Sequence, residues 1–306
     1  MVSTLLPLIP KHRIYVEAFG GAGALLFAKP RSAVEVYNDI DSGLVNLYRV
    51  LRDPESFQQL YKKAVLTPYS REEFYTMRET WSQTEDPVER AYRYYVVARM
   101  SFAGIFGNSW ALWVAQSSRG ISGATRSYLS ALERLPEIHQ RLSVVQIEHL
   151  DFRRIFQIYD SPETFFYLDP PYVPETRRAG EYAHEMSLED HRELVGILLK
   201  IQGRALLSGY QHEVYGPLEE AGWARVDMIT NCSVVGRTRA TGLQGRGSLI
   251  HKQRRTESLW FNYAPPVAAL RKLSQLLGNP NTGPGAAPGG NAGNGVHASA
   301  PAAGGV

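Results

Sequence analysis

The sequence predicts an α/β fold, in which a Rossmann-like sheet carries an inserted, mostly helical region. Three observations support this prediction. Residues 11–41 have the pattern of a strand, a glycine-rich turn, a helix and a second strand, which is how a doubly wound sheet begins. Residues 64–140 lose this strand–helix rhythm, and it returns from residue 143 onwards. A chain of 306 residues is long enough for one such domain with a sizeable insertion.

The first expected strand runs into the turn Phe19-Gly20-Gly21-Ala22-Gly23. Glycines let the backbone approach a ligand closely, and the start of the helix that follows offers unpaired N–H groups to a carboxylate. The spacing of these glycines differs from Gly-x-Gly-x-x-Gly. The difference argues against a pyrophosphate cofactor and favours a smaller nucleoside.

The second expected strand covers residues 34–38 and is followed by Asp39. A carboxylate at this position of a doubly wound sheet can bind ribose hydroxyls. Residues 42–63 have the apolar spacing of a helix, and Asp41-Ser42 is a plausible start signal. The short apolar stretch Leu5–Pro10 is expected to begin a helix before the first strand.

Residues 64–140 are rich in aromatic and arginine side chains, and most of these aromatics are expected in a core. The stretch Ser101–Arg126 mixes small polar residues, aromatics and arginines, including Arg119 and Arg126. Such a mixture is what a loop that reads bases needs, and the position of this stretch in the family resemblance given below favours contact with DNA. The alternative is a hairpin or lid with a structural tryptophan.

Beyond residue 143 we expect strands at 144–147, 165–168 and 204–208 and an amphipathic helix at 188–201. The strand 165–168 is followed by Asp169-Pro170-Pro171-Tyr172. An exocyclic amine on an aromatic ring is a poor nucleophile, because its lone pair is delocalised into the ring. Asp169 and the Pro170 carbonyl can each accept one of its N–H groups, and Tyr172 can stack on a base taken out of its duplex. The alternative is a turn that merely ends the strand.

The order of these motifs gives the chain a resemblance to the D12-class (Dam-type, alpha-group) N6-adenine-specific DNA methyltransferases, over residues 1 to about 263. This resemblance implies S-adenosyl-L-methionine as the cofactor. It implies that catalysis depends on Asp169, Pro170, Pro171 and Tyr172. The cofactor-binding residues that it implies are Glu17, Phe19, Gly20, Gly21, Gly23, Asp39, Asp151, Phe152 and Asp169. Ser208-Gly209-Tyr210 resembles a motif that shapes the base pocket, and Glu257–Asn262 resembles the closing strand of the family.

The resemblance also implies a division of the chain. The catalytic domain of an S-adenosylmethionine-dependent methyltransferase is expected in two parts, 1–63 and 141–264, around a target-recognition region at 64–140. A C-terminal helix is expected at 265–277. Residues 278–306 contain no Asp, Glu, Lys or Arg, so we expect a disordered tail. The family normally begins with a Lys/Gly-bearing segment that touches the cofactor, and we expect this chain to start beyond it.

The expected reaction is methyl transfer from S-adenosyl-L-methionine to N6 of a flipped adenine in double-stranded DNA. N4-cytosine methylation is an alternative, although such enzymes more often have serine at the position of Asp169. RNA or protein amide methylation more often has asparagine there. A catalytically impaired DNA-binding relative is a further alternative. A cognate restriction endonuclease is a candidate partner, and no metal is expected. The expected location is the cytoplasm of a bacterial or phage-infected cell.

Charge and cysteine content bear on DNA contact, disulfide formation and location. The net charge of +3 is only mildly basic, but residues 237–255 hold six Lys or Arg and no acid. We expect Arg237, Arg239 and Arg246 in this stretch to contact DNA phosphates, the alternative being a solvated surface loop. Cys232 is the only cysteine, so no internal disulfide can form and an intracellular location is expected. There is no apolar run of membrane length. His184 and His191 are expected at the surface or at a pocket edge.

Overall fold

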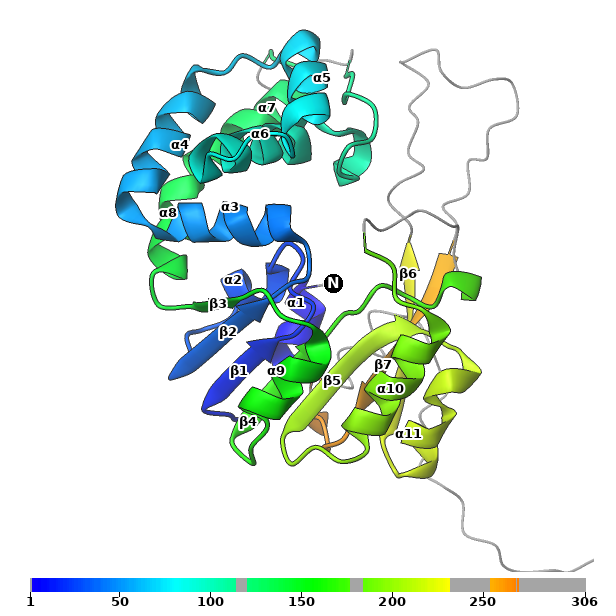
Figure 1. Ribbon diagram of the computed structural model, residues 1–306. Helices are drawn as coiled ribbons and strands as arrows, with labels where there is room; N and C mark the ends of the chain where they lie inside the picture. The colour runs from blue at the N-terminus through cyan, green and yellow to red at the C-terminus, as the bar shows by residue number, and fades with distance from the viewer. Residues whose placement is uncertain (1, 114–119, 177–183, 232–253, 268, 270–306) are drawn as a thin grey trace, which may run out of the picture.

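The computed structural model describes residues 2–113, 120–176, 184–231, 254–267 and 269. A seven-stranded sheet forms its centre, in the order β3-β2-β1-β4-β5-β7-β6 (Figure 1). The strands are β1 (Ile14–Glu17), β2 (Val34–Asn38), β3 (Gln146–Glu148), β4 (Thr164–Leu168), β5 (Arg204–Tyr210), β6 (Ala224–Asn231) and β7 (Arg254–Phe261). The first five are parallel, whereas β7 lies antiparallel between β5 and β6. This mixed sheet confirms the predicted Rossmann-like fold.

The direction of the strand order changes at β1, since β2 lies on one side of it and β4 on the other. The register pairs Glu17 with Tyr37 on β2 and with Tyr167 on β4, so all three strands end at the same edge. Ligands of open α/β sheets bind in the crevice outside the carboxyl ends of the strands at such a switch point. The topology therefore places the glycine turn, Asp39 and Asp169 at one crevice.

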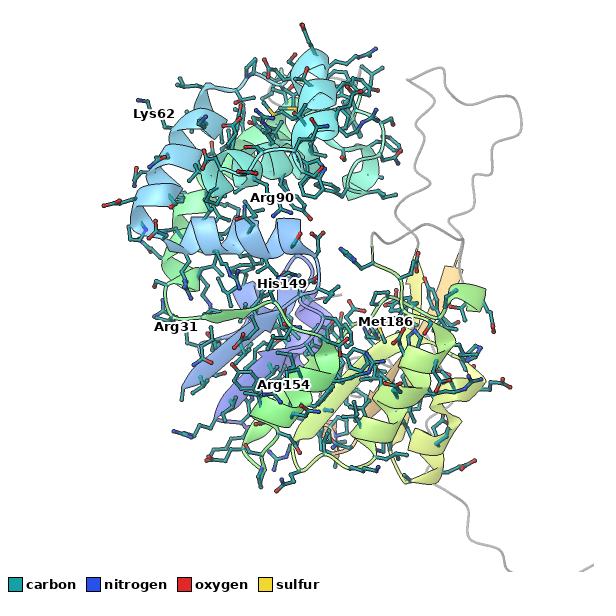
Figure 2. All side chains as sticks on the ribbon, in the orientation of Figure 1. Arg31, Lys62, Arg90, His149, Arg154 and Met186 are labelled. Carbon is teal, nitrogen blue, oxygen red and sulfur yellow. The ribbon has the colours of Figure 1, made fainter. Side chains whose placement is uncertain are left out.

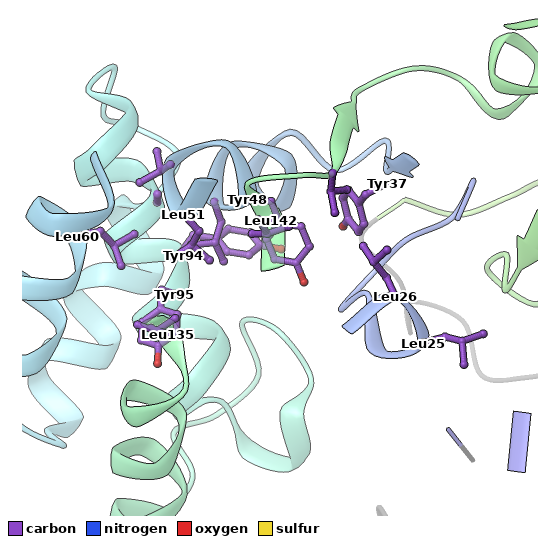
Figure 3. Close-up of a cluster of buried hydrophobic side chains, with 14 of the residues drawn as sticks. Leu25, Leu26, Tyr37, Tyr48, Leu51, Leu60, Tyr94, Tyr95, Leu135 and Leu142 are labelled. Atoms are coloured by element: carbon purple, nitrogen blue, oxygen red, sulfur yellow. The ribbon is translucent and has the colours of Figure 1, made fainter. Parts of the chain in front are cut away.

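Alternation along the buried strands supplies two cores, one on each face of the sheet. Val16, Phe166 and Leu207 point to the face covered by α9 (Phe152–Tyr159), α10 (Leu188–Leu198) and α11 (Gly216–Glu220). Tyr15 and Phe165 belong to the core of the opposite face. That second core continues without a break from the sheet into the helical region, and the side chains labelled in Figure 3 belong to it. The sheet and the helical region are therefore packed on shared apolar side chains.

The helical region follows β2 directly. Its helices are α3 (Ser42–Arg52), α4 (Pro54–Leu66), α5 (Arg71–Thr80), α6 (Pro87–Met100), α7 (Gly123–Glu133) and α8 (Leu135–Leu142). They gather beyond the carboxyl ends of the strands (Figure 1). The domain boundary predicted at residue 63 falls inside α4.

Two helices occupy residues 42–63, where helical spacing alone gave no sign of a break. Asp53 ends α3 in an extended conformation and then caps α4 by accepting from Ser56 N. Pro54 follows at the first position of α4, where its missing N–H costs nothing. The start signal was read correctly, because the Asp41 carboxylate accepts from Gly43 N and Leu44 N at the beginning of α3.

The other elements that the sequence predicted, where the structure describes them, match it to within a few residues. The N-terminal segment forms α1 (Val2–Leu5) and a short 3-10 turn, η1 (Leu6–Leu8), and α2 (Ala24–Ala28) follows the glycine turn. Further 3-10 turns are η2 (Phe102–Gly104), η3 (Pro174–Thr176) and η4 (Glu213–Tyr215). The expected strand at 144–147 starts two residues later. The expected helix at 188–201 ends at Leu198 and has a capping box formed by Ser187 and Asp190.

Several predictions lie outside the described residues. They concern Cys232, the tail at 278–306 and nearly all of the helix at 265–277. Across the part of the chain that the structure describes, none of the helices has the length and apolar character needed to cross a bilayer.

Candidate active site

A cavity of about 790 Å³ lies at the carboxyl ends of β1, β2 and β4. It brings together most of the residues predicted for catalysis and cofactor binding. Those that line it are Glu17, Phe19, Gly20, Gly21, Asp39, Asp151, Phe152, Asp169, Pro171 and Tyr172. Gly23 and Pro170 are absent from its lining, although each is next to residues of the same two motifs.

The glycine turn forms one wall, and Tyr37 holds it in place. Gly20 N donates to Asn38 O at 2.8 Å, and the Tyr37 hydroxyl donates to Gly21 O at 2.7 Å. A Cβ atom on Gly20 would lie 2.2 Å from the Tyr37 ring, so only glycine fits there. A Cβ on Gly21, which has a φ of +48°, would meet no atom within 4 Å. The turn thus rests tightly on Tyr37, while Gly21 has open space beside it.

Glu17 ends β1 and lines the cavity. Its side-chain Oε1 accepts from the Tyr15 hydroxyl and from Leu26 N, both at 2.7 Å. Leu26 lies in α2, so an N–H of this helix is used by the protein's own carboxylate. Burial raises the pKa of Glu17 to about 7, and the nearby Asp169 carboxylate adds to the shift. The residue is 1% exposed.

Asp39 follows β2 and is fixed by two backbone groups. Its Oδ2 accepts from Gly21 N at 2.7 Å, and its Oδ1 accepts from Asp41 N at 2.8 Å. Burial raises its pKa, while these two hydrogen bonds oppose the shift. Each carboxylate oxygen keeps further acceptor capacity. Asp39 is therefore held in one orientation at the cavity wall and can still accept from a ligand hydroxyl.

An apolar slot adjoins Asp39. The ring of Phe152 packs on that of Phe19, with 5.5 Å between their centroids. Ile40 is 49% exposed and lines the same cavity, although it was not singled out as a site residue from the sequence. The sequence could have indicated Ile40 as a site residue, because it lies between Asp39 and Asp41. Asp151 caps α9 by accepting from Arg153 N at 2.8 Å, so its carboxylate also has a structural task.

Arg153 is a cavity residue that sequence reasoning missed. Its guanidinium pairs with Asp151 at 3.0 Å, with Asp190 at 2.6 Å and with Glu193. It also lies over the Phe152 ring at 4.4 Å. These contacts tie α9 to α10 and fix the ring that forms the apolar wall. No local motif marks the residue, since its acidic partners on α10 lie 37 and 40 positions away in the sequence.

Asp169, directly after β4, accepts hydrogen bonds from the hydroxyls of Tyr167, Tyr172 and Ser208. Burial raises its pKa to about 6, and these three donors oppose the shift. Tyr167 was treated in the sequence only as a strand residue. Its spacing of two from Asp169 was a usable signal, because side chains two apart on a strand face the same side.

The Tyr172 ring is only 8% exposed. It packs edge-on against Tyr210 with 4.6 Å between centroids, and its hydroxyl lies 3.3 Å from Ser208 Oγ. The Tyr172 ring thus packs against other side chains of the protein, and its stacking on a substrate base stays a prediction.

The residues predicted to contact DNA are only partly described. Arg126 lies in the first turns of α7. Arg119, Arg237, Arg239 and Arg246 fall outside the described residues. Trp110 packs between Tyr69 and Arg71, at 5.2 and 5.0 Å, and borders the core. These contacts favour a structural role for that tryptophan.

One prediction about the histidines was wrong. His191 is fully buried, and the Tyr215 hydroxyl lies 3.0 Å from its Nδ1, because α10 turns this face toward η4. His184 lines the cavity, as predicted for a pocket-edge residue. Within the described ranges, no group of three or more His, Cys, Asp or Glu side chains could hold a metal ion.

Comparison with known proteins identifies relatives of this chain. A family model described as D12 class N6 adenine-specific DNA methyltransferase matches residues 1–214, a segment that contains every residue of the cavity lining. The chain is also similar to the Type II methyltransferase M1.LlaDCHI of Lactococcus lactis subsp. cremoris. The two are 31% identical over 200 residues, which is 60% of this chain and 66% of the relative. The chain thus spans just under two thirds of the length of that curated relative.

Proposed function

The chain belongs to the D12 class of N6 adenine-specific DNA methyltransferases, and we propose that it transfers a methyl group from S-adenosyl-L-methionine to N6 of an adenine flipped out of duplex DNA. The observation that carries this proposal is the position of Asp169. Its carboxylate shares one cavity with the glycine turn and with Asp39. An acid that can hold an amine and a wall that can hold a nucleoside are therefore adjacent.

The residues of the cavity fit S-adenosylmethionine. Asp39 is held by two backbone N–H groups and can accept from ribose hydroxyls, and Ile40 and Phe152 can offer apolar surfaces to the adenine ring. Glu17 and Asp169 place two carboxylates in the wall of the same cavity, where a positively charged ligand is favoured. When bound there, S-adenosylmethionine supplies an electrophilic methyl group on a sulfonium.

The catalytic task of the protein is then to position and polarise the amine. We propose that Asp169 accepts one N6–H and that the Pro170 carbonyl accepts the other, which returns electron density to the nitrogen. The hydroxyls of Tyr167, Tyr172 and Ser208 hold the Asp169 carboxylate in one orientation. No covalent intermediate with the protein is needed, because alignment and electrostatics lower the barrier.

Aspartate at position 169 favours adenine over the cytosine alternative, which more often has serine there. The proposed substrate is double-stranded DNA, and the proposed location is the cytoplasm of a bacterial or phage-infected cell. The Lactococcus relative is named a Type II methyltransferase. On that basis we propose a restriction endonuclease of matching specificity as a partner.

The test is to incubate the purified protein with S-adenosylmethionine and unmethylated duplex DNA, and to identify methylated nucleosides by mass spectrometry. We expect N6-methyladenine. Asp169→Ala should lower its formation by a factor of roughly 10² or more, as for loss of one preorganised electrostatic group. Asp169→Asn is the matched variant that keeps the shape and removes the charge. Formation of N4-methylcytosine, or substantial activity of Asp169→Ala, would contradict the proposal.

A further inference from the structure

A hydroxyl on α6 of the helical region contacts Asp41, which lines the cavity. Tyr94, on α6, donates from its hydroxyl to Asp41 Oδ2 at 3.0 Å. The ring is 5% exposed. Burial and the Asp41 carboxylate raise the pKa of Tyr94 well above its usual value, so the phenol keeps its proton and remains a donor. Arg90, labelled in Figure 2, reaches from the same helix to Ser42 Oγ at 2.8 Å.

Asp41 links Tyr94 to the cavity wall through further hydrogen bonds. Its Oδ1 accepts from Gly43 N at 2.7 Å, which fixes the first turn of α3. Its own N–H donates to Asp39 Oδ1 at 2.8 Å, and Asp39 Oδ2 accepts from Gly21 N at 2.7 Å. A continuous series of hydrogen bonds therefore runs from Tyr94 to the glycine turn. Asp41, Asp39 and Gly21 all line the cavity.

On its other side Tyr94 contacts the loop 101–110. The ring of Phe106 stacks on Tyr94, with 4.3 Å between centroids and 25° between planes, and Trp81 packs edge-on at 5.2 Å. The loop is closed by a β-bridge between Ser101 and Trp110. A Cβ on Gly43 would lie 2.6 Å from both Trp81 and Tyr94, so this glycine lets the rings rest directly on α3.

We propose that Tyr94 is a positioning residue that couples DNA contact at the loop 101–110 to cofactor binding at Asp39. The inference rests on the proposed function, because the loop lies in the stretch expected to contact DNA. DNA that restrains the loop fixes Phe106 on the Tyr94 ring. The hydroxyl then holds Asp41, whose N–H orients Asp39 toward the ribose. Coupling of this kind is reciprocal, so the cofactor strengthens DNA binding by the same factor.

The test compares Tyr94→Phe with Tyr95→Phe in the full chain. Tyr95 is the matched control, because it is buried on the same helix and no described residue forms a hydrogen bond with its hydroxyl. Equilibrium dialysis measures the affinity for S-adenosylhomocysteine, which lacks the methyl group and so cannot react. Each protein is measured alone and with the duplex DNA that the wild type methylates in the nucleoside assay.

We expect Tyr94→Phe to weaken S-adenosylhomocysteine binding about fivefold without DNA and to bring the ratio of affinities with and without DNA close to one. Phe106→Leu, which keeps the hydroxyl, should also reduce this ratio. Tyr95→Phe should match the wild type in both measurements. A Tyr94→Phe protein with the wild-type affinity and ratio would overturn the inference, even if its melting temperature fell. Failure of the wild type to methylate any DNA would instead contradict the proposed function, while the DNA-free affinities would still test Tyr94.

Discussion

Glu17 and Asp169 are two carboxylates that face one cavity from adjacent strands. Burial raises the pKa of both, and the charge on Asp169 makes ionisation of Glu17 harder still. Raised pKa values in a cleft are typical of functional groups. The two residues differ in their other contacts, however, because Glu17 accepts from a backbone N–H of α2, whereas the donors to Asp169 among the described residues are side-chain hydroxyls. We therefore expect ionisation of Asp169 to control activity and ionisation of Glu17 to affect stability.

The pKa of Asp169 predicts a pH dependence for the reaction. Only the ionised carboxylate can accept an N6–H on both of its oxygens, and its pKa is about 6. The kcat/KM value should therefore be low at pH 5 and rise to a plateau above pH 7, since this parameter reports the free enzyme. Initial rates of methyl transfer across this range provide the measurement. A wild-type profile that is flat from pH 5 to pH 8 would refute the assignment.

The raised pKa of Glu17 predicts that the stability of the fold decreases with pH, whereas activity increases. Its pKa is about 7 in the fold and 4.5 in an unfolded chain. Between these values the folded protein holds a proton that the unfolded chain has lost, so stability falls as pH rises through this window. The full difference above pH 7 is on the order of 3 kcal/mol.

Glu17→Gln should consequently raise the melting temperature at pH 8 and leave it nearly unchanged at pH 4. The amide oxygen of glutamine can still accept from Tyr15 and Leu26, so both hydrogen bonds are kept. Differential scanning calorimetry at the two pH values is the measurement. An equal effect of the substitution at both would show that the carboxylate charge is not what destabilises the fold.

At the scale of elements, alanine substitutions at two adjacent positions of the glycine turn should differ in their cost to stability. Gly20→Ala places a methyl group in the Tyr37 ring, which is itself packed on Tyr48 at 4.7 Å, and should destabilise the fold by about 2 kcal/mol or more. Gly21→Ala meets no neighbour and should cost only the roughly 1 kcal/mol of a left-handed alanine. Urea unfolding of the two variants measures their free energies of unfolding. Equal losses would mean that Tyr37 can move aside.

Most elements could be predicted because their signals are local. β1 ends at Glu17, an acid directly follows β2 and β4, and Asp41 marks the start of α3. The break at Asp53-Pro54 was missed because apolar spacing continues through it, although the proline itself was visible. The burial of His191 could not be derived, since it depends on Tyr215, 24 residues further along the chain.

At the scale of the molecule, a buried cluster of charges joins the helical region to the sheet. Arg141, on α8, donates to both carboxylate oxygens of Glu35 and to Leu26 O at 3.0 Å. Lys29 pairs with the same carboxylate at 2.6 Å. Arg141 and Glu35 are 106 positions apart, so no pattern in the sequence could pair them. The cavity was predictable from its two motifs, whereas the contacts that hold the helical region against it were not.

Residues 237–253 of the basic stretch lie outside the described residues, and their role stays a prediction from the sequence. Exchange of Arg237, Arg239 and Arg246 for Gln should weaken binding to all DNA sequences alike, because phosphate contacts carry no sequence information. The slope of log K against log salt should become less negative by up to about 3, since each lost phosphate contact removes roughly 0.9. Fluorescence anisotropy over a salt series provides the measurement.

The matched control for this prediction exchanges three exposed arginines of the described residues, Arg31, Arg154 and Arg192, of which Arg31 and Arg154 are labelled in Figure 2. This control changes the net charge by the same amount. If general electrostatic attraction governed binding, both triple variants would lose affinity equally. If residues 237–255 contact the phosphates directly, only the first variant should change the salt slope. A loss confined to one DNA sequence would instead show that these arginines read bases.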